Sequence, residues 1–237
     1  MGDSIKLKIN KCEFFRSKVN FLGHVINCDG IRKSPEYVEK VKHITRPVTV
    51  SQLRKILGLI NFQSKFISQC SELSKPLSEI TGGPKRKAIK WTPEQCQAFE
   101  MLKDKVCRDA LLAYPDYGSS AEKLELYVDA SGTGAGATLM QKQGSKQRTI
   151  AYASMNFYTT QMSYSATECK LVALRWGIQT MRSFVFGVPF LLFTDHKPLI
   201  FSDSMSVHNS KLMHTLEELA EYNFEVRYIP GPSNESA

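Results

Sequence analysis

The chain has 237 residues, of which 42% are hydrophobic, enough for one large domain or two small ones. It has no apolar run of about eighteen residues and no apolar start of signal-peptide type, so we expect an intracellular protein, nuclear or cytoplasmic, without a membrane partner. The six cysteines lack C-x-x-C pairs and zinc-finger spacing, which favours reduced thiols over disulfides or a metal site.

The net charge of +8 is unevenly distributed. Residues 1–90 hold 18 Lys and Arg against 7 Asp and Glu, a net charge of +11, whereas residues 91–237 carry a net charge of −3. A basic segment of this kind is typical of a protein that contacts phosphate backbones, with an ordinary solvated surface as the alternative. The acidic remainder suits a module that binds cations.

Residues 5–33 are predicted to form β structure. The run from Lys18 to Ile26 alternates loosely between apolar and polar side chains, and the Asn-Cys-Asp-Gly sequence at 27–30 supplies turn residues. We therefore expect a β-hairpin that ends near residue 33.

Three helices are expected between residues 34 and 80. The Ser-Pro pair at 34–35 is typical of a helix start, Thr49 or Ser51 can cap a second helix, and a third should run from 72 to 80. The second helix has an apolar stripe that predicts a core-facing side: Leu53, Ile56, Leu57, Ile60 and Ile67. The basic, glycine-rich loop at 82–87 marks a boundary.

The second half of the chain predicts a mixed α/β unit. A helix should begin at Thr92-Pro93, after Trp91 as a packing anchor, and lead to a connector that ends near residue 116. The remaining pattern predicts strands at 123–129, 134–141, 148–155, 189–194 and 223–229, with helices at 164–184 and 208–220. The fold class is therefore α/β.

Two aspartates carry the strongest chemical signal. Asp129 and Asp195 each end a β-like apolar run, and carboxylates at the ends of neighbouring strands can chelate divalent cations. In such sites a third carboxylate normally comes from a helix packed beside the strands. The helix between them reads Ala-Thr-Glu-Cys-Lys-Leu-Val-Ala-Leu at 166–174, which makes the charge at position 170 decisive.

A series of short motifs resembles, in order and spacing, Ty3/gypsy-type retrotransposon polyproteins. The motifs are FLGHV (21–25), LRKILGL (53–59), KPL (75–77), WT (91–92), YPD (114–116), VDAS (128–131), YAS (152–154), TDH (194–196) and YIPG (228–231). The resemblance is to the carboxy-terminal part of their reverse transcriptase, over nearly the whole chain.

This resemblance implies four parts. Residues 1–33 are a residual palm hairpin, which in the family grips the primer end, residues 34–82 a helical thumb and residues 83–116 a connector. Residues 117–237 are an RNase H-like domain, expected to contain a mixed five-stranded sheet with flanking helices. The polymerase fingers and most of the palm are absent, so we expect no polymerase activity from this chain.

The resemblance also implies a catalytic site. In the family, RNase H cleaves the RNA strand of an RNA/DNA hybrid with four carboxylates around two Mg²⁺ ions, for which Mn²⁺ can substitute. Asp129 and Asp195 match two of them, but Lys170 takes the place of the helix glutamate and Glu168 matches a non-catalytic acidic position on nearly the opposite helix face. The fourth carboxylate would follow the Asn-Glu-Ser-Ala sequence at 234–237.

Lys170 predicts weak metal binding or none. Exchanging glutamate for lysine changes the local charge by two, and repulsion between like charges at about 4 Å reaches several kcal/mol per ion at intermediate dielectric. We expect the ammonium group to pair with Asp129 and Asp195 instead. His196 is expected to be structural or to face the substrate.

The basic first part offers candidate contacts to a nucleic-acid backbone. We single out Arg54, Lys55, Gly58, Lys65, Lys85, Arg86 and Lys87. Gly58 can allow close approach either of a nucleic-acid groove or of a neighbouring helix, and residues 85–87 can equally be a solvated linker. The aromatic side chains of Phe14, Phe15, Tyr37, Phe62 and Phe66 can stack on bases, but a core position is favoured.

Three functions are compatible with these features. The first is a fragment that binds RNA/DNA hybrid or duplex nucleic acid after losing RNase H cleavage. The second is an active RNase H of a retrotransposon polyprotein. The third is a host-adopted scaffold that binds a protein partner.

Overall fold

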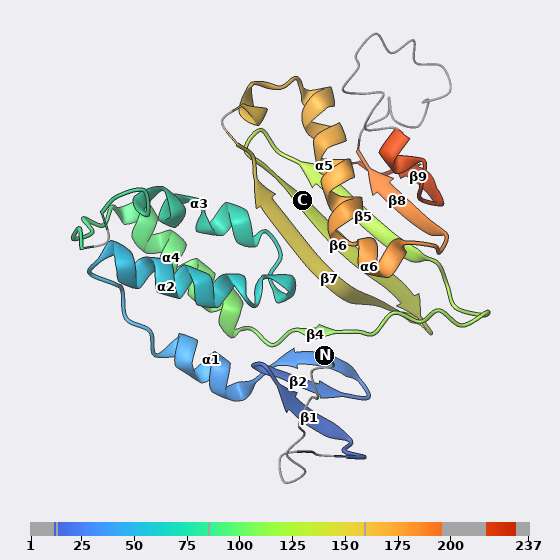
Figure 1. Ribbon diagram of the computed structural model, residues 1–237, viewed down its shortest axis with the longest axis horizontal. Helices are drawn as coiled ribbons and strands as arrows, with labels where there is room; N and C mark the ends of the chain where they lie inside the picture. Colours follow the sequence, from blue (N-terminus) through green and yellow to red (C-terminus); the bar gives the residue numbers. More distant parts are fainter. Residues whose placement is uncertain (1–11, 13, 85, 159, 196–216, 231–237) are drawn as a thin grey trace, which may run out of the picture.

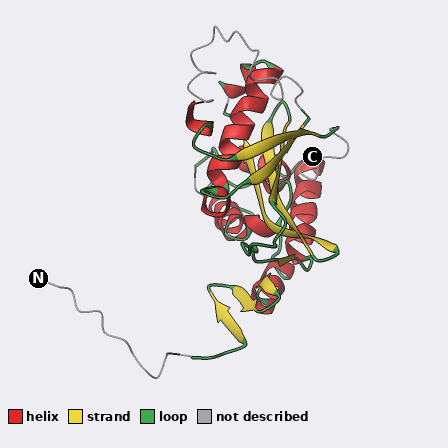
Figure 2. Ribbon diagram, turned by 90° about the vertical axis from the view of Figure 1, so that its right-hand side faces the viewer, coloured by secondary structure: helices red, strands yellow, loops and turns green. Residues whose placement is uncertain are grey.

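The structure is a computed structural model that describes residues 12, 14–84, 86–158, 160–195 and 217–230. It contains a small four-stranded sheet, a group of helices and a five-stranded sheet (Figure 1). Figure 2 shows the small sheet at one end of the molecule. Within the described ranges, no helix combines the length and apolarity needed to cross a bilayer.

The small sheet is antiparallel throughout. Its strands, in sheet order, are β1 (Lys18–Phe21), β2 (His24–Asn27), β3 (Gly30–Lys33) and β4 (Leu111–Leu112). The predicted turn at 27–30 is confirmed, but the single strand expected before it is wrong. Leu22 and Gly23, with φ angles of 46° and 75°, form a tight turn that divides it into β1 and β2. Positive φ at both central residues matches the twist of a two-residue hairpin.

Local capping explains where the helices begin. The helices are α1 (Pro35–Lys42), α2 (Val50–Asn61), α3 (Cys70–Ile80) and α4 (Pro93–Cys107), with a 3₁₀ turn η2 (Ser64–Phe66) between α2 and α3. The Ser34 side chain accepts a hydrogen bond from the Tyr37 amide. Thr49 and Thr92 each form a capping box with the glutamine three residues later, which confirms both predicted starts.

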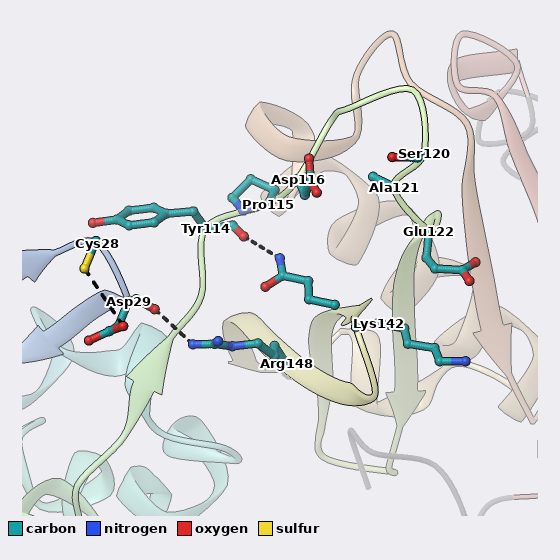
Figure 3. Close-up of a pocket in the computed structure, with 12 residues that line it drawn as sticks. Cys28, Asp29, Tyr114, Pro115, Asp116, Ser120, Ala121, Glu122, Lys142 and Arg148 are labelled. Carbon is teal, nitrogen blue, oxygen red and sulfur yellow. Dashed lines mark hydrogen bonds between the residues drawn. The ribbon is translucent and has the colours of Figure 1, made fainter.

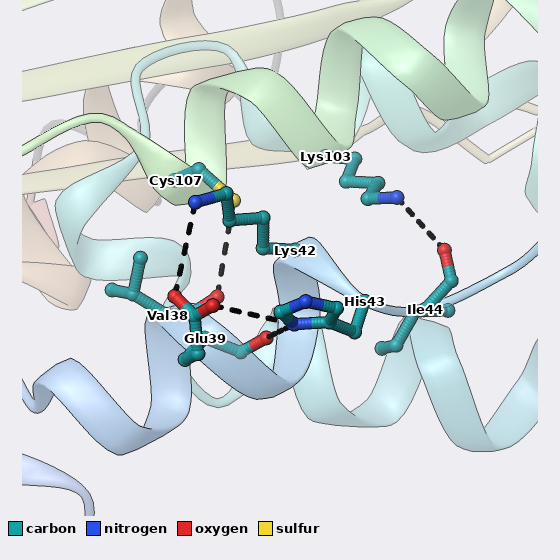
Figure 4. Close-up of polar contacts among 7 residues, drawn as sticks. All are labelled: Val38, Glu39, Lys42, His43, Ile44, Lys103 and Cys107. Atoms are coloured by element: carbon teal, nitrogen blue, oxygen red, sulfur yellow. Dashed lines mark hydrogen bonds and ion pairs between the residues drawn. The ribbon is translucent and has the colours of Figure 1, made fainter.

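Helix α4 joins the other helices into one core. Leu102 and Val106 of α4 are fully buried and belong to the same apolar cluster as Leu53 of α2 and Leu77 of α3. Polar contacts reinforce this packing on the α1 side (Figure 4), where the Lys103 ammonium donates to the Ile44 carbonyl at 2.8 Å. This hydrogen bond holds the segment that follows α1 against α4.

The large sheet has the order β7-β6-β5-β8-β9. Its strands are β5 (Leu124–Ala130), β6 (Gly134–Gln143), β7 (Lys146–Asn156), β8 (Phe190–Thr194) and β9 (Phe224–Tyr228). Strands β5 to β7 form an antiparallel meander, whereas β5, β8 and β9 run parallel. Because β5 and β8 are parallel neighbours, the chain must cross over from one end of the sheet to the other between them. Helices that follow the β5–β7 meander form this crossover.

The crossover between β7 and β8 contains three helical elements. They are η3 (Gln161–Ser163), α5 (Ala166–Thr180) and α6 (Arg182–Val185), so the helix expected at 164–184 is interrupted at Met181. Figure 1 shows α5 lying across the sheet, with its apolar side in the same core as the strands. Residues 217–219 are helical, and the rest of the helix expected at 208–220 lies outside the described residues.

Strand β7 connects the two halves of the molecule. Helix α3 and the η2 turn pack against it, and Tyr152 contacts the core of the helices. The Ser71 amide donates to Ser154 Oγ at 2.8 Å, and the Ser71 hydroxyl donates to the Ser154 carbonyl at 2.7 Å. The helices and the large sheet are therefore joined by direct hydrogen bonds.

Candidate carboxylate site and nucleic-acid surface

The register of two parallel strands positions Asp129 and Asp195. Tyr127 of β5 pairs with Phe193 of β8, and their rings stack with centroids 4.6 Å apart. Asp129 in β5 and Asp195, which directly follows β8, each lie two residues further on, so they come close together at the same end of adjacent strands. The sheet therefore brings together the two carboxylates predicted from sequence.

Helix α5 places Lys170 beside this pair. At Gly177 the helix lies so close to β5 that an added Cβ would be 2.9 Å from the Val128 side chain. Lys170 lies two turns earlier on the same helix side, and its Nζ donates to Asp195 Oδ2 at 2.5 Å. The two side chains are only 20% and 22% exposed, so this ion pair is largely shielded from solvent.

Asp129 is affected by the same charges. Its pKa is raised, first because burial disfavours the charged form and also because Asp195 is near, while the Ala130 amide and Lys170 act in the opposite direction. The second oxygen of Asp195, Oδ1, is buried and accepts no hydrogen bond from the part of the chain that the structure describes. As expected, Lys170 interacts with both aspartates: it forms a hydrogen-bonded ion pair with Asp195 and acts on Asp129 through its charge.

Glu168 is engaged at the start of α5. Its Oε2 accepts hydrogen bonds from the Ser165 amide at 2.9 Å and from the Ser165 hydroxyl at 2.8 Å, in a capping box. A carboxylate used in this way stabilises the helix terminus. This position agrees with the expectation that Glu168 does not replace a carboxylate at position 170.

A hollow of about 240 Å³ opens beside Asp129. Ser131 and Asn156 line it from the large sheet, and Gln69 and Glu72 line it from the region of α3. No local sequence pattern indicates these α3 neighbours, because they precede Asp129 by about sixty residues and meet it only through the packing of α3 on β7.

One face of α2 is exposed and contains two of the predicted nucleic-acid contacts. Lys55 and Gly58 are exposed, and a Cβ added to Gly58 would meet no atom within 4 Å. The neighbouring-helix explanation for Gly58 is therefore wrong within the described residues. Phe62, one turn further, is 53% exposed. On this face Gly58, which has no side chain, therefore lies between the cation of Lys55 and the aromatic ring of Phe62.

The aromatic side chains divide into two groups. Tyr37 and Phe66 are 7% and 4% exposed and belong to the core, as favoured from sequence. Phe14, Phe15 and Phe62 are 71%, 106% and 53% exposed, so a core position is wrong for these three. Phe62 is the one among them on the same helix face as Gly58.

The remaining basic candidates have different environments. Arg54 Nη2 donates to the carbonyls of Thr81 and Gly83, so this guanidinium holds the loop after α3. The Lys65 ammonium lies 5.4 Å from the centroid of the Phe66 ring, and burial lowers its pKa. Arg86 and Lys87 are exposed, whereas Lys85 and His196 lie outside the described residues.

A polar cavity that sequence reasoning missed lies where the small sheet meets the large one (Figure 3). It has a volume of about 600 Å³, and Arg148 crosses it to donate to the Asp29 carbonyl at 2.9 Å. Gln143 donates to the Tyr114 carbonyl at 2.7 Å. Its walls come from three distant segments, the turn at 28–29, the stretch 114–122 and the β6–β7 hairpin, so no local pattern could reveal it.

Comparisons with known proteins identify the family. Residues 119–222 match the model of the RNase H-like domain found in reverse transcriptase. The chain is 33% identical over 235 residues to the Retrovirus-related Pol polyprotein from transposon 297 of Drosophila melanogaster, covering 99% of this chain and 21% of that polyprotein. It belongs to the Ty3/gypsy-type retrotransposon Pol family.

Further relatives agree with this assignment. The Pol-type chain is 32% identical over 232 residues to the Transposon Tf2-3 polyprotein of Schizosaccharomyces pombe, covering 96% of this chain and 17% of that polyprotein. It therefore spans about a fifth of the length of the polyproteins that it matches.

Solved structures confirm the α/β fold. The foamy viral protease-reverse transcriptase dRH in complex with double-stranded DNA superposes with a TM-score of 0.74 at 25% identity, over 90% of this chain and 38% of that one. The foamy viral protease-reverse transcriptase in complex with RNA/DNA hybrid gives a TM-score of 0.73 at 24% identity, over 94% of this chain and 30% of that one.

The residues of this Pol RNase H-like domain do not fit a pair of divalent metal ions, which domains of this kind generally use. Two carboxylates converge, but the Lys170 ammonium is hydrogen-bonded to one of them and brings a positive charge to the same place. No group of three or more His, Cys, Asp or Glu suited to a metal is found in the described ranges. Residues 234–237, next to the fourth family position, lie outside those ranges.

Proposed function

We propose that this chain is a thumb and RNase H-like module that binds duplex nucleic acid or RNA/DNA hybrid and no longer cleaves the hybrid. The proposal assigns residues 1–33 to a palm hairpin, 34–82 to the thumb, 83–116 to a connector and 117–237 to the RNase H-like domain. The observation that carries it is the 2.5 Å contact between Lys170 and Asp195.

Two features support binding. The first ninety residues carry a net charge of +11, and the exposed α2 face combines Lys55, Gly58 and Phe62. Because glycine has no Cβ, it lets a helix approach a nucleic-acid groove closely. An exposed aromatic ring can pack against sugars or bases. The solved foamy viral relatives are complexes with double-stranded DNA and with RNA/DNA hybrid, which points to the same class of ligand.

The charge at the carboxylate site supports a loss of cleavage. Hydrolysis of this type needs metal ions that activate water and stabilise the leaving oxygen, and anionic ligands must offset the metal charge. At this site an internal ammonium group already neutralises Asp195. A divalent ion would have to displace it or bind beside it, and both are unfavourable in a largely buried position.

The decisive experiment combines binding and cleavage. We expect the wild-type chain to bind a labelled hybrid with an affinity that falls steeply with added salt, and to leave it uncut in Mg²⁺ or Mn²⁺. We expect added Mn²⁺ to raise the melting temperature of the Lys170→Glu variant and to leave that of the wild type unchanged.

Lys142→Glu is the matched control, because it makes the same charge change at an exposed lysine of β6. Wild-type cleavage of the hybrid, removed by Asp129→Asn, would overturn the loss of activity. Absence of hybrid and duplex binding at low salt would overturn the binding function.

A further inference from the structure

The turn between β1 and β2 is attached to the end of α2. The Gly23 carbonyl at this turn accepts hydrogen bonds from the Ser34 amide at 2.9 Å and from Gln63 Nε2 at 3.3 Å. Gln63 directly follows the C-cap of α2 and is completely buried. The turn itself exposes its apolar residues, because Phe21 and Leu22 are 58% and 66% accessible to solvent.

His24 provides the second attachment. Its ring lies between Phe62 and Phe66, with centroid separations of 5.5 Å to each, and its side chain is only 8% exposed. Its Nε2 atom is buried, with no hydrogen-bond partner among the described residues. A histidine in this position acts as a flat, neutral ring that fills the space between two aromatic side chains.

We propose that His24 and Gln63 are positioning residues that lock the β1–β2 turn to the end of α2. The lock makes one surface of two separate parts: the turn residues Phe21 and Leu22, and Gly58 and Phe62 of the helical segment. The Gln63 hydrogen bond to Gly23 and the contact of the His24 and Phe62 rings join the two parts directly. The value of this surface for binding a duplex rests on the proposed function.

The surroundings of His24 make the lock sensitive to acid. Lys65 of η2 acts on the imidazole, and Lys33 of β3 is its cross-strand neighbour. Lys33 in turn interacts with Cys107 and Asp109. Burial and then Lys65 lower the pKa of His24, while the Phe21 backbone, the Gln63 side chain and the Leu22 backbone favour protonation more weakly.

The direction of the pH effect follows from this lowered pKa. An open turn releases His24 to water, where its pKa returns toward 6.5, so the open form takes up a proton more readily than the locked form. The lock is thus fully stable above pH 6.5 and is lost as the pH falls through the lower pKa of the locked state.

The test uses the full chain and two independent readouts. The first is hydrogen exchange of the amides in residues 19–24, corrected for intrinsic rates. The second is affinity for a 20-base-pair DNA duplex, a probe length of about two helical turns. Between pH 7.5 and 5.5 we expect wild-type exchange to rise by up to about tenfold, because pH 5.5 lies one unit below the ordinary histidine pKa of 6.5, and affinity for the duplex to fall.

Two variants separate the parts of the proposal. His24→Phe keeps a ring next to Phe62 and Phe66 but cannot titrate, so both pH effects should disappear. Gln63→Met keeps the side-chain length without the amide donor and should raise turn exchange at every pH. The matched control is His43→Phe, which removes an exposed histidine of the α1 C-cap and should leave the wild-type pH profile intact.

The outcomes distinguish the lock from the proposed function. Equal pH profiles of turn exchange in the wild type and His24→Phe would overturn the lock. If the wild type binds no duplex at any pH but its turn opens with acid as expected, the lock stands and the binding function fails. If turn exchange follows the expectation while affinity does not, the lock is real but does not shape the binding surface.

Discussion

Lys170 and Asp195 form an ion pair in which Nζ lies 2.5 Å from Oδ2, between side chains that are about one fifth exposed. Removing the ammonium with Lys170→Met would leave Asp195 charged and unpaired beside Asp129, which is itself half-buried. We expect this change to lower the free energy of unfolding by about 2 kcal/mol, between the values for exposed and fully buried pairs. Urea denaturation at pH 7.5 measures it.

A double-mutant cycle isolates the pair. Asp195→Asn alone should also destabilise the fold, because it leaves the Lys170 ammonium without its carboxylate partner. The variant with both substitutions should recover part of the lost free energy of unfolding. Lys146→Met, at an exposed position of β7, is the control and should change stability by less than about 0.5 kcal/mol. Strictly additive effects of the two substitutions would mean that the contact contributes nothing.

Arg54 and Lys55 are neighbours with different tasks. The Arg54 guanidinium donates to two carbonyls after α3, whereas Lys55 is exposed on the α2 face that includes Gly58. We expect Arg54→Ala to cost about 1 to 2 kcal/mol of stability, as for lost hydrogen bonds to a charged group. Lys55→Ala should leave stability unchanged and reduce the salt dependence of duplex binding by about one phosphate contact.

Parallel denaturation and salt titrations of the two variants check this difference. Each variant is the control for the other, because both remove one positive charge from adjacent helix positions. The assignment is wrong if Lys55→Ala destabilises the chain as much as Arg54→Ala, or if Arg54→Ala changes only the salt slope.

The elements that local chemistry controls were predictable. Thr49 and Thr92 open their helices through contacts with residues three positions later, so their sequences alone indicate the starts. The position of Asp129 and Asp195 at the ends of neighbouring strands was also predictable, because each ends an apolar run; these strands, β5 and β8, pair in parallel. The identity of Lys170 could be interpreted at once, since the family pattern fixes its helix position.

The missed features depend on the folded chain. The turn at Leu22 has no local signal because leucine rarely adopts a positive φ; here the pairing of β1 with β2 and the hydrogen bonds to the Gly23 carbonyl hold it. Arg54 looked like a phosphate contact because its carbonyl partners lie 27 and 29 residues away. The pairing of β3 with β4 joins residues about eighty positions apart and has no periodic signal of its own.

Gly30 is required by this pairing of β3 with β4. Its φ of 141° is unfavourable for other residues, and an added Cβ would lie 2.1 Å from the Leu112 carbonyl oxygen. Gly30→Ala must push the two strands apart, and we expect a loss of about 3 kcal/mol in the free energy of unfolding. The control is Gly144→Ala in the β6–β7 hairpin, where φ is 62° and no atom of the described residues lies within 4 Å of an added Cβ.

At Gly144 the substitution adds only left-handed strain, about 1 kcal/mol. Urea denaturation of both variants, followed by circular dichroism, measures the difference. Equal losses at the two positions would show that the contact between Gly30 and β4 does not constrain the small sheet.

Cys70 is expected to resist alkylation in the folded protein. It is 2% exposed at the start of α3, and burial raises the pKa of its thiol to about 11, with a smaller opposite effect from Lys105. Because the raised pKa favours the neutral thiol, this group stabilises the fold below the ordinary pKa of 9.0, and the contribution is lost as the pH rises through about 11. At pH 8 its thiolate fraction is about a hundredfold lower than that of an ordinary thiol.

Iodoacetamide labelling at pH 8, followed by mass spectrometry of peptides, tests this expectation. Cys28 is exposed and serves as the control within the same molecule, so it should be labelled in minutes while Cys70 remains unmodified. Repeating the reaction in urea should label both cysteines equally, because unfolding removes the burial that raises the Cys70 pKa. Labelling of Cys70 at the rate of Cys28 without urea would mean that α3 separates from the core readily under native conditions.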